Sequence, residues 1–143
     1  MVAFMITGGI VYSNDGIINT SIKIKEVDGK IVAEIGGVQT EIGNTWTNNG
    51  KIDVAGGNGI IIDSSVTEDS KFSLINNGSI IGNNSFGYEK GNGIYNYNGI
   101  IKNLINNGVI LGNSDKDAQS SGNGILNLNG KIENLTNRGV ILG

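Results

Sequence analysis

One nine-residue string recurs through the second half of the chain and constrains its fold more than any other feature. Leu74–Gly82 reads LINNGSIIG, Leu104–Gly112 reads LINNGVILG, and Leu135–Gly143 reads LTNRGVILG. The copies start 30 and 31 residues apart, and a fainter copy starts at Trp46, 28 residues before the first. A fixed period of this length is typical of solenoid proteins, in which each repeat is one stacked unit.

A second motif keeps the same period. Gly-Asn-Gly-Ile occurs at Gly57–Ile60, Gly91–Ile94 and Gly122–Ile125, and a third pattern links Asn98–Asn103 with Asn129–Asn134. Each period contains three short stretches rich in β-branched residues, and none shows a helical spacing of apolar residues. The sequence therefore predicts an all-β fold, a right-handed three-sided parallel β-helix whose strands pair with their equivalents one coil away, at about 4.8 Å.

The repeat divides the chain in two. We assign residues 44–143 to the β-helix and residues 1–43 to an irregular N-terminal β segment or cap. Ser21–Ile35 alternates around Asp28-Gly29, a hairpin turn signal, and this hairpin would cover the open end of the solenoid. Ser13–Ile18 reads as a degenerate first copy of the corner motif.

Gly143 falls midway through a repeat, so we expect the array to continue in a longer protein; the alternative is that a partner chain covers the last rung.

The repeat also assigns residues to columns that stack from coil to coil. We expect two inward apolar columns, a third apolar pair, and a polar column at a corner. These are, in order, Trp46, Leu74, Leu104 and Leu135; Ile52, Ile80, Ile110 and Ile141; Ile94 and Ile125; and Asn48, Asn76, Asn106 and Asn137. Asparagine tolerates left-handed backbone and can bond the copies above and below. The glycines two residues later, Gly50, Gly78, Gly108 and Gly139, are expected where a corner requires positive φ.

Composition excludes several classes of function. The chain has no cysteine and no histidine, which excludes disulfides, cysteine–zinc sites, Ser-His-Asp and Cys-His mechanisms and a histidine pH switch. Its net charge is −3, and its lysines and arginines are scattered singly. We therefore expect no nucleic-acid partner.

Departures from the period are the candidate functional segments. Asn83–Lys90 and Asn113–Ser121 follow the same position of the repeat, so they should leave one edge of the solenoid, one above the other; Asp63–Lys71 is a third polar insertion at a different phase. Loops on one side of a repeat scaffold are the usual binding surface. The candidate binding residues are Phe86, Tyr88, Glu89, Lys90, Asp115, Lys116 and Asp117. Phe86 and Tyr88 could stack on a sugar or a protein partner, and the alternative for Phe86 is that it folds back over apolar surface.

The carboxylates do not form a recognisable catalytic pattern. A glycosidase needs two of them facing one cleft, about 5 to 10 Å apart. The candidates lie mostly in loops beside lysine or serine, as solvated charges do: Asp53, Asp63, Glu68, Asp69, Glu89, Asp115, Asp117 and Glu133. Asp115-Lys116-Asp117 lacks the further oxygen ligands of a calcium loop. We therefore expect no catalytic residues, no metal site and no cofactor.

The Asn-Asn-Gly and Gly-Asn-Gly-Ile units over about residues 44–143 resemble the passenger repeats of type V autotransporter adhesins. This resemblance implies an exported protein on a bacterial surface, attached through a β-barrel translocator outside this chain, with adhesion, aggregation or biofilm formation as its function. No binding motif of the family matches, so the resemblance transfers no functional residue.

Two functions follow as expectations. The first is a secreted or surface-displayed adhesin-type scaffold, without enzymatic activity, that presents loops to a host or neighbouring-cell protein or glycan and has exposed ends that could self-associate. The alternative is a carbohydrate-active β-helix, a polysaccharide lyase or hydrolase, since many such enzymes share the fold.

Overall fold

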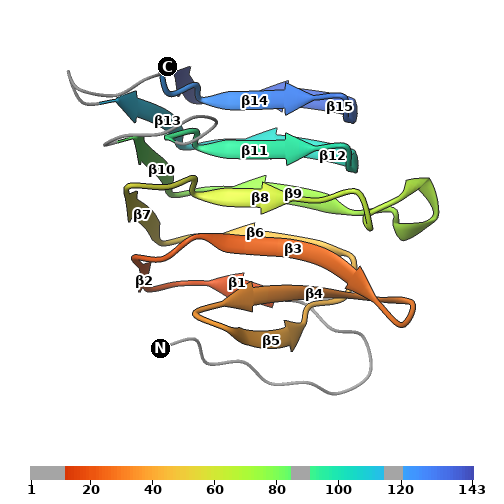
Figure 1. Cartoon of the computed structure of the whole chain (residues 1–143). Coiled ribbons are helices and arrows are strands. Elements are labelled where there is room, and N and C mark those ends of the chain that lie inside the picture. The colour runs from red at the N-terminus through yellow and green to blue at the C-terminus, as the bar shows by residue number, and fades with distance from the viewer. Residues whose placement is uncertain (1–11, 85–90, 115–120) are drawn as a thin grey trace.

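The computed structural model describes residues 12–84, 91–114 and 121–143, and it confirms the predicted fold class. The chain is an all-β solenoid of about four turns, in which the strands run round three parallel sheets and rise from one end to the other (Figure 1). The helical structure in these ranges is one 3-10 turn, η1 (Glu68–Ser70). None of these segments forms a helix long and apolar enough to cross a membrane.

Each sheet takes one strand from every coil. The first sheet contains β1 (Tyr12–Asn14), β6 (Thr45–Asn48), β9 (Ser73–Asn76), β12 (Ile100–Asn106) and β15 (Lys131–Asn137). The second contains β2 (Ile17–Ile18), β7 (Lys51–Ala55), β10 (Ser79–Asn84), β13 (Val109–Ser114) and β16 (Val140–Leu142). The third contains β3 (Ile22–Val27), β8 (Ile60–Ile62), β11 (Ile94–Tyr97) and β14 (Ile125–Leu128), and it also holds β4 (Lys30–Ile35) and β5 (Val38–Glu41).

The strand registers confirm the predicted columns. The leucine column pairs in order from Trp46 to Leu135, the first isoleucine column from Ile52 to Ile141, and Ile94 lies beside Ile125. Within the inner coils these side chains are fully buried and form one continuous core. Burial of this kind stabilises the fold by about 25 cal/mol per Å² of apolar surface. Because each side chain packs on the same residue type in the next coil, a change of size at any one position would disturb its neighbours.

The first coil belongs to the same solenoid. Asn14 is in register with Asn48 and Ile18 with Ile52, which confirms that Ser13–Ile18 is a first copy of the corner motif. Tyr12 takes the leucine-column position and stacks on Trp46, with ring centroids 4.2 Å apart. Burial there raises the pKa of the Tyr12 hydroxyl to about 12. Solenoid architecture thus extends into the segment before residue 44.

The predicted hairpin is also present. β3 and β4 pair antiparallel around Asp28 and Gly29, whose φ values of 52° and 78° suit a tight two-residue turn. β4 then pairs antiparallel with β5, so the third sheet continues past β3 at the N-terminal end (Figure 1). Ile31, Ala33 and Ile42 are buried in the core, so this segment covers that end of the third sheet.

The predicted reason for the corner glycines is wrong. The glycines that follow the asparagine column are absent from the described positions of positive φ. A Cβ on Gly78 would lie 1.9 Å from the carbonyl oxygen of Gly50, and one on Gly108 would lie 2.0 Å from that of Gly78. Glycine is therefore needed at this corner because successive coils approach too closely for a side chain. The left-handed asparagines are instead Asn98 and Asn129, in the turns between the third and first sheets.

Candidate binding surfaces

Two of the three insertions leave the solenoid at the same edge. β10 and β13 end in register, with Asn83 beside Asn113 and Asn84 beside Ser114, so the segments that follow them start one coil apart. They also return in register, because the backbone N–H of Asn123 donates to Asn92 Oδ1 at 3.0 Å. The bases of both insertions therefore lie one above the other, as the repeat predicted.

The bases of these loops are held rigidly. Asn92 is buried, and its backbone N–H donates to Asn58 Oδ1 at 3.0 Å in the coil below. A Cβ on Gly82 would lie 2.0 Å from the carbonyl oxygen of Asn92, and one on Gly112 would meet Asn123 at 2.1 Å. The strand that enters each loop is thus packed directly on the segment that leaves it, which fixes both ends of the loop.

The residues predicted to bind lie outside the residues that the structure describes. They stay predictions: Phe86, Tyr88, Glu89, Lys90, Asp115, Lys116 and Asp117.

The third insertion, Asp63–Lys71, is anchored to the solenoid rather than freely projecting. Val66 is buried, and its carbonyl oxygen accepts from the backbone N–H of Ile100 at 2.9 Å. Ser70 Oγ donates to Glu26 Oε1 at 2.7 Å, and Ser65 Oγ accepts from the backbone N–H of Glu26 at 2.8 Å. The insertion is therefore attached to the end of β3, next to the hairpin turn.

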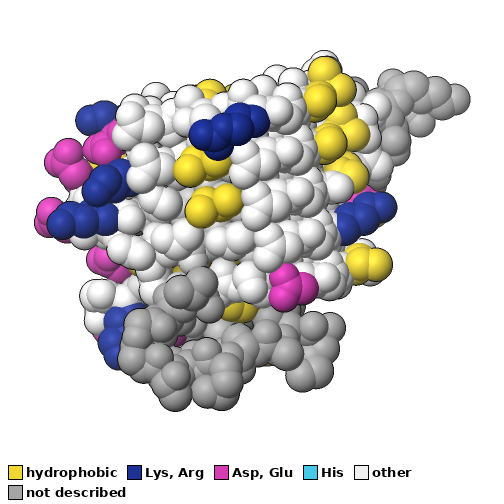
Figure 2. All heavy atoms as spheres, turned by 180° about the vertical axis from the view of Figure 1, so that it is seen from behind, with side chains coloured by type: hydrophobic (Ala, Val, Ile, Leu, Met, Phe, Trp, Pro, Cys, Tyr) yellow, Lys and Arg dark blue, Asp and Glu magenta, His cyan; other side chains and the backbone are white. Residues whose placement is uncertain are grey.

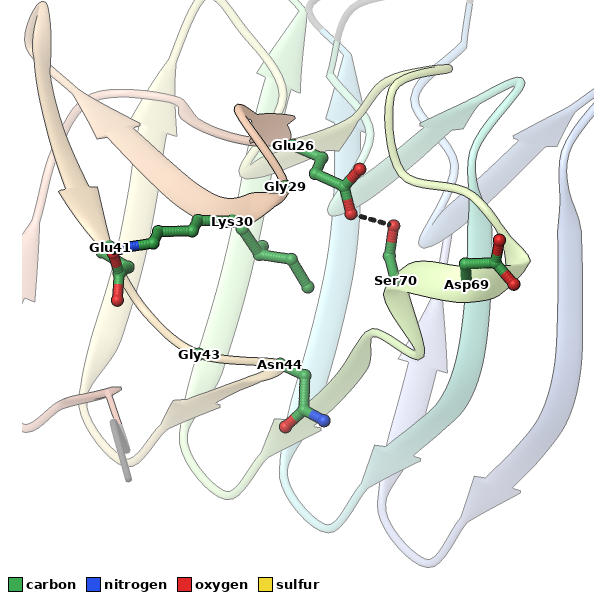
Figure 3. Close-up of a pocket in the computed structure, with 9 residues that line it drawn as sticks. Glu26, Gly29, Lys30, Glu41, Gly43, Asn44, Asp69 and Ser70 are labelled. Atoms are coloured by element: carbon green, nitrogen blue, oxygen red, sulfur yellow. Dashed lines mark hydrogen bonds and ion pairs between the residues drawn. The ribbon is translucent and has the colours of Figure 1, made fainter. Parts of the chain in front are cut away.

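A small polar cavity lies where the insertion meets the hairpin (Figure 3). It has a volume of about 220 Å³, and its charged lining comes from Glu26, Lys30, Glu41 and Asp69. Lys30 Nζ lies 3.2 Å from Glu41 Oε1, while Glu26 accepts from Ser70. The sequence pointed to the insertion but not to Glu26 or Glu41, because only the folded hairpin brings them to Asp69.

The candidate carboxylates are dispersed. Asp53 lies on β7 of the second sheet beside Lys51, with 3.4 Å between Nζ and Oδ2. Glu133 lies on β15 of the first sheet beside Lys131, at 3.8 Å between Nζ and Oε1. Asp63 follows β8 of the third sheet and bonds the Ser65 hydroxyl. The structure thus places these three on different sides of the solenoid, while Glu68 and Asp69 lie together in η1.

One face of the solenoid offers little concentrated charge, as Figure 2 shows. On the face shown in Figure 2, lysine, arginine and acidic side chains lie mainly toward the edges, and uncharged polar and aliphatic groups cover most of the area between them. Among the described residues, no group of three or more histidine, cysteine, aspartate or glutamate side chains could hold a metal ion.

Comparison with models of protein families, with curated proteins and with solved structures finds no match to this chain.

Proposed function

We propose that this chain is a non-catalytic β-helical scaffold of the adhesin type, which binds a protein or glycan of a host or neighbouring cell through the loops at 83–90 and 113–121. The observation that carries the proposal is the register of the loop bases, with Asn83 beside Asn113 and Asn92 beside Asn123. Two loops whose bases lie one coil apart, at about 4.8 Å, can contact one partner together.

The scaffold suits this task because hydrogen bonds and close backbone contacts join the strand ends at the bases of the loops. The loop bases are tied through buried asparagines, and glycines allow the backbone segments to touch. Loop bases that are fixed before a partner binds have little freedom to lose on binding, which favours affinity.

The location of the protein is part of the same proposal. The asparagine- and glycine-rich repeat resembles exported passengers, so we place the chain outside the cell or on a bacterial surface. Its membrane attachment would be through a translocator domain, and its net charge of −3 favours partners other than nucleic acid.

A binding array of glycans and host proteins tests the proposal. The purified chain is compared with a variant whose 83–90 and 113–121 segments are shortened to Gly-Ser. A matched control carries Lys131→Ala and Glu133→Ala on the first sheet, away from the loops. We expect binding by the chain and the control, and loss of binding by the shortened variant with its circular dichroism spectrum unchanged.

Two results would contradict the proposal. Equal binding by all three proteins would place the binding surface elsewhere on the solenoid. Turnover of an acidic or neutral polysaccharide by the purified chain would instead support the carbohydrate-active alternative.

A further inference from the structure

The outer face of the third sheet carries two tyrosines on one strand, β11. Ile94 and Asn96 of this strand are fully buried, so alternation directs Tyr95 and Tyr97 away from the core. The two rings meet edge to face, with centroids 5.7 Å apart and planes at 61°. Tyr97 is 43% exposed, whereas Tyr95 is 7% exposed. The contact therefore holds the Tyr97 ring in place while part of that ring stays open to solvent.

Tyr97 lies within the array of coils, with a neighbouring coil on each side. In the register of β11 with β14, Leu128 lies beside Tyr97. On the other side, β11 pairs with β8, where Ile62 lies beside Asn96. The Tyr97 ring is therefore exposed because it points outward from the sheet, which faces the viewer in Figure 1.

Asp63 lies next to Tyr97 on the same face. It follows Ile62 as Tyr97 follows Asn96, so the two residues occupy the next position of the register. The backbone N–H of Asp63 donates to Ile24 O at 3.3 Å, so the chain still pairs with β3 at this point. Because Ile62 is buried in the core, alternation directs Asp63 outward. Adjacent strands lie about 4.8 Å apart, which places the Asp63 side chain beside that of Tyr97.

One oxygen of the Asp63 carboxylate is fixed by the protein and the other is open. Asp63 Oδ1 accepts from the backbone N–H of Ser65 at 2.9 Å and from the Ser65 hydroxyl. That hydroxyl in turn accepts from the backbone N–H of Glu26 at 2.8 Å, which ties the turn to β3. Within the described part of the chain, Asp63 Oδ2 has no hydrogen bond or ion pair. It is therefore an oriented acceptor for a hydroxyl group of a ligand.

The charges near Tyr97 disfavour a charged ligand of either sign. The carboxylate of Asp63 would repel an anion that stacks on the ring. On the same face, β3 carries Lys23 and Lys25, and Lys25 Nζ is paired with Glu34 Oε1 at 2.9 Å. Lys23 has no ion pair with any of the described residues, so β3 adds a positive charge that opposes a cation. This surface therefore fits an uncharged ligand that has an apolar side and hydroxyl donors.

We propose that Tyr97, Asp63 and Ile61, which we name the tyrosine site, bind a neutral saccharide. The C–H groups on one side of a sugar ring would lie on the exposed part of the Tyr97 ring, and its hydroxyl groups would donate to Asp63 Oδ2. Ile61, half-buried on β8 beside Tyr95, adds aliphatic surface for an adjoining sugar. β11 runs away from β10 and β13, from whose ends the two loops start, so Tyr97 lies at the far end of its strand (Figure 1). The tyrosine site is therefore separate from the loops and goes beyond the proposed function.

Saturation-transfer NMR with the full chain tests the tyrosine site in solution. The neutral probes are lactose, cellobiose and maltose, the acidic probes are glucuronic acid and sialyllactose, and the cationic probe is a trilysine peptide. We expect saturable binding of neutral saccharides only. Because the site is open to solvent, the dissociation constant should be about millimolar, weaker than an array detects.

Four substitutions separate the tyrosine site from general stickiness. Tyr97→Ala removes the ring and should weaken binding about tenfold, whereas Tyr97→Phe keeps the ring and should change it by less than about twofold. Asp63→Asn keeps an acceptor for Ser65 but loses the charge, and it should weaken binding about fivefold. Val109→Ala is the matched control, because it shortens an outward apolar side chain of similar exposure on the second sheet, and binding should be unchanged. Circular dichroism verifies that each variant is folded.

The proposal is overturned if none of the neutral saccharides binds, or if Tyr97→Ala binds them as well as the unchanged chain does. Binding of the acidic or cationic probes alone would assign the surface to another class of ligand and would also overturn it. The variant with shortened 83–90 and 113–121 segments should keep its binding of neutral saccharides. Loss of that binding would place the saccharide on the loops, so the failure of this proposal is distinguishable from the failure of the proposed function.

Discussion

Asn76 and Gly78 show how much of this fold depends on single residues at one corner. The Asn76 amide donates to Gly78 O at 3.2 Å, Asn106 Oδ1 at 2.8 Å and Val109 O at 3.0 Å, and it accepts from Asn48 Nδ2 at 2.9 Å. The side chain is fully buried, so each of these bonds replaces one that water would otherwise make. The adjacent glycine allows the coils to come close enough for the ladder to form.

We expect Gly78→Ala to destabilise the protein by about 3 kcal/mol, because the new Cβ would overlap the carbonyl oxygen of Gly50 and force the coils apart. The equivalent residue of the first coil, Gly16, has open space on this side: a methyl group there would meet no atom within 4 Å. Gly16→Ala should therefore change stability by less than about 1 kcal/mol. Urea denaturation of both variants measures the difference. Equal effects would show that backbone conformation, not coil contact, selects glycine.

Replacing Asn76 with alanine removes the ladder at an inner coil, so that Asn48 Nδ2 loses its bond to Asn76 Oδ1 and Asn106 Oδ1 loses its bond from Asn76 Nδ2. We expect a loss of about 2 to 4 kcal/mol in the free energy of unfolding, since buried polar groups lose their partners. Asn137→Ala, at the exposed end of the ladder, should cost less than about 1 kcal/mol. Chemical denaturation of the two variants measures both losses in the free energy of unfolding. Equal losses would show that the buried ladder does not add to stability.

The buried Tyr12 hydroxyl should make the folded chain less stable at alkaline pH. Its pKa is about 12 in the folded chain and 10.0 in its unperturbed state, so the unfolded chain loses the proton first. Stability is therefore full below pH 10 and falls as the pH rises from 10 toward 12, by roughly 2 kcal/mol. Tyr12→Phe should remove that part of the decline. The measurement is the melting temperature of both proteins between pH 8 and 11. If the two melting temperatures fall with pH at the same slope, the hydroxyl is not responsible.

At the scale of elements, the hairpin of β3, β4 and β5 differs from the rest because it pairs antiparallel and has ion pairs between its strands. Lys25 Nζ donates to Glu34 Oε1 at 2.9 Å, and Gln39 Nε2 donates to the same oxygen at 3.2 Å. The parallel strands rely instead on buried columns. The insertion 63–71, which appeared to be a polar loop in the sequence, contributes Val66 to the core and a bond from Ser70 to the end of β3.

Acid should therefore weaken the hairpin before the coils. The hydrogen bonds from Lys25 and Gln39 lower the pKa of Glu34, so their stabilisation is present above the ordinary pKa of glutamate, near 4.5, and is lost as the pH falls through the lower folded value. Glu34→Gln should reduce this acid dependence. Melting temperatures from pH 6 to pH 3 give the measurement, and an unchanged slope in the variant would assign the effect to other carboxylates.

For the whole molecule, the solenoid is nearly one-dimensional, since each coil contacts only the coils beside it. The inner columns are fully buried, whereas Leu135 is half exposed. Stability should therefore decrease toward the last coil.

Hydrogen exchange would display this gradient. We expect the amides of β9 and β10 to be protected most strongly and those of β15 and β16 to exchange through local opening at lower free energy. Uniform protection across all coils would indicate that the solenoid opens as a single cooperative unit.

The sequence by itself determined the period, the three sheets and the buried columns through its repeat, and the hairpin around Asp28-Gly29 through local alternation and a turn signal. What only the tertiary structure decided depends on distances between coils. The contact of Gly78 with Gly50, the cavity that joins Glu26 to Asp69, and the anchoring of Val66 bring together residues without a shared local pattern. Coil stacking sets these distances: strands pair about 4.8 Å apart, and at the corner of Gly78 the coils approach so closely that an added Cβ would lie 1.9 Å from the carbonyl oxygen of Gly50.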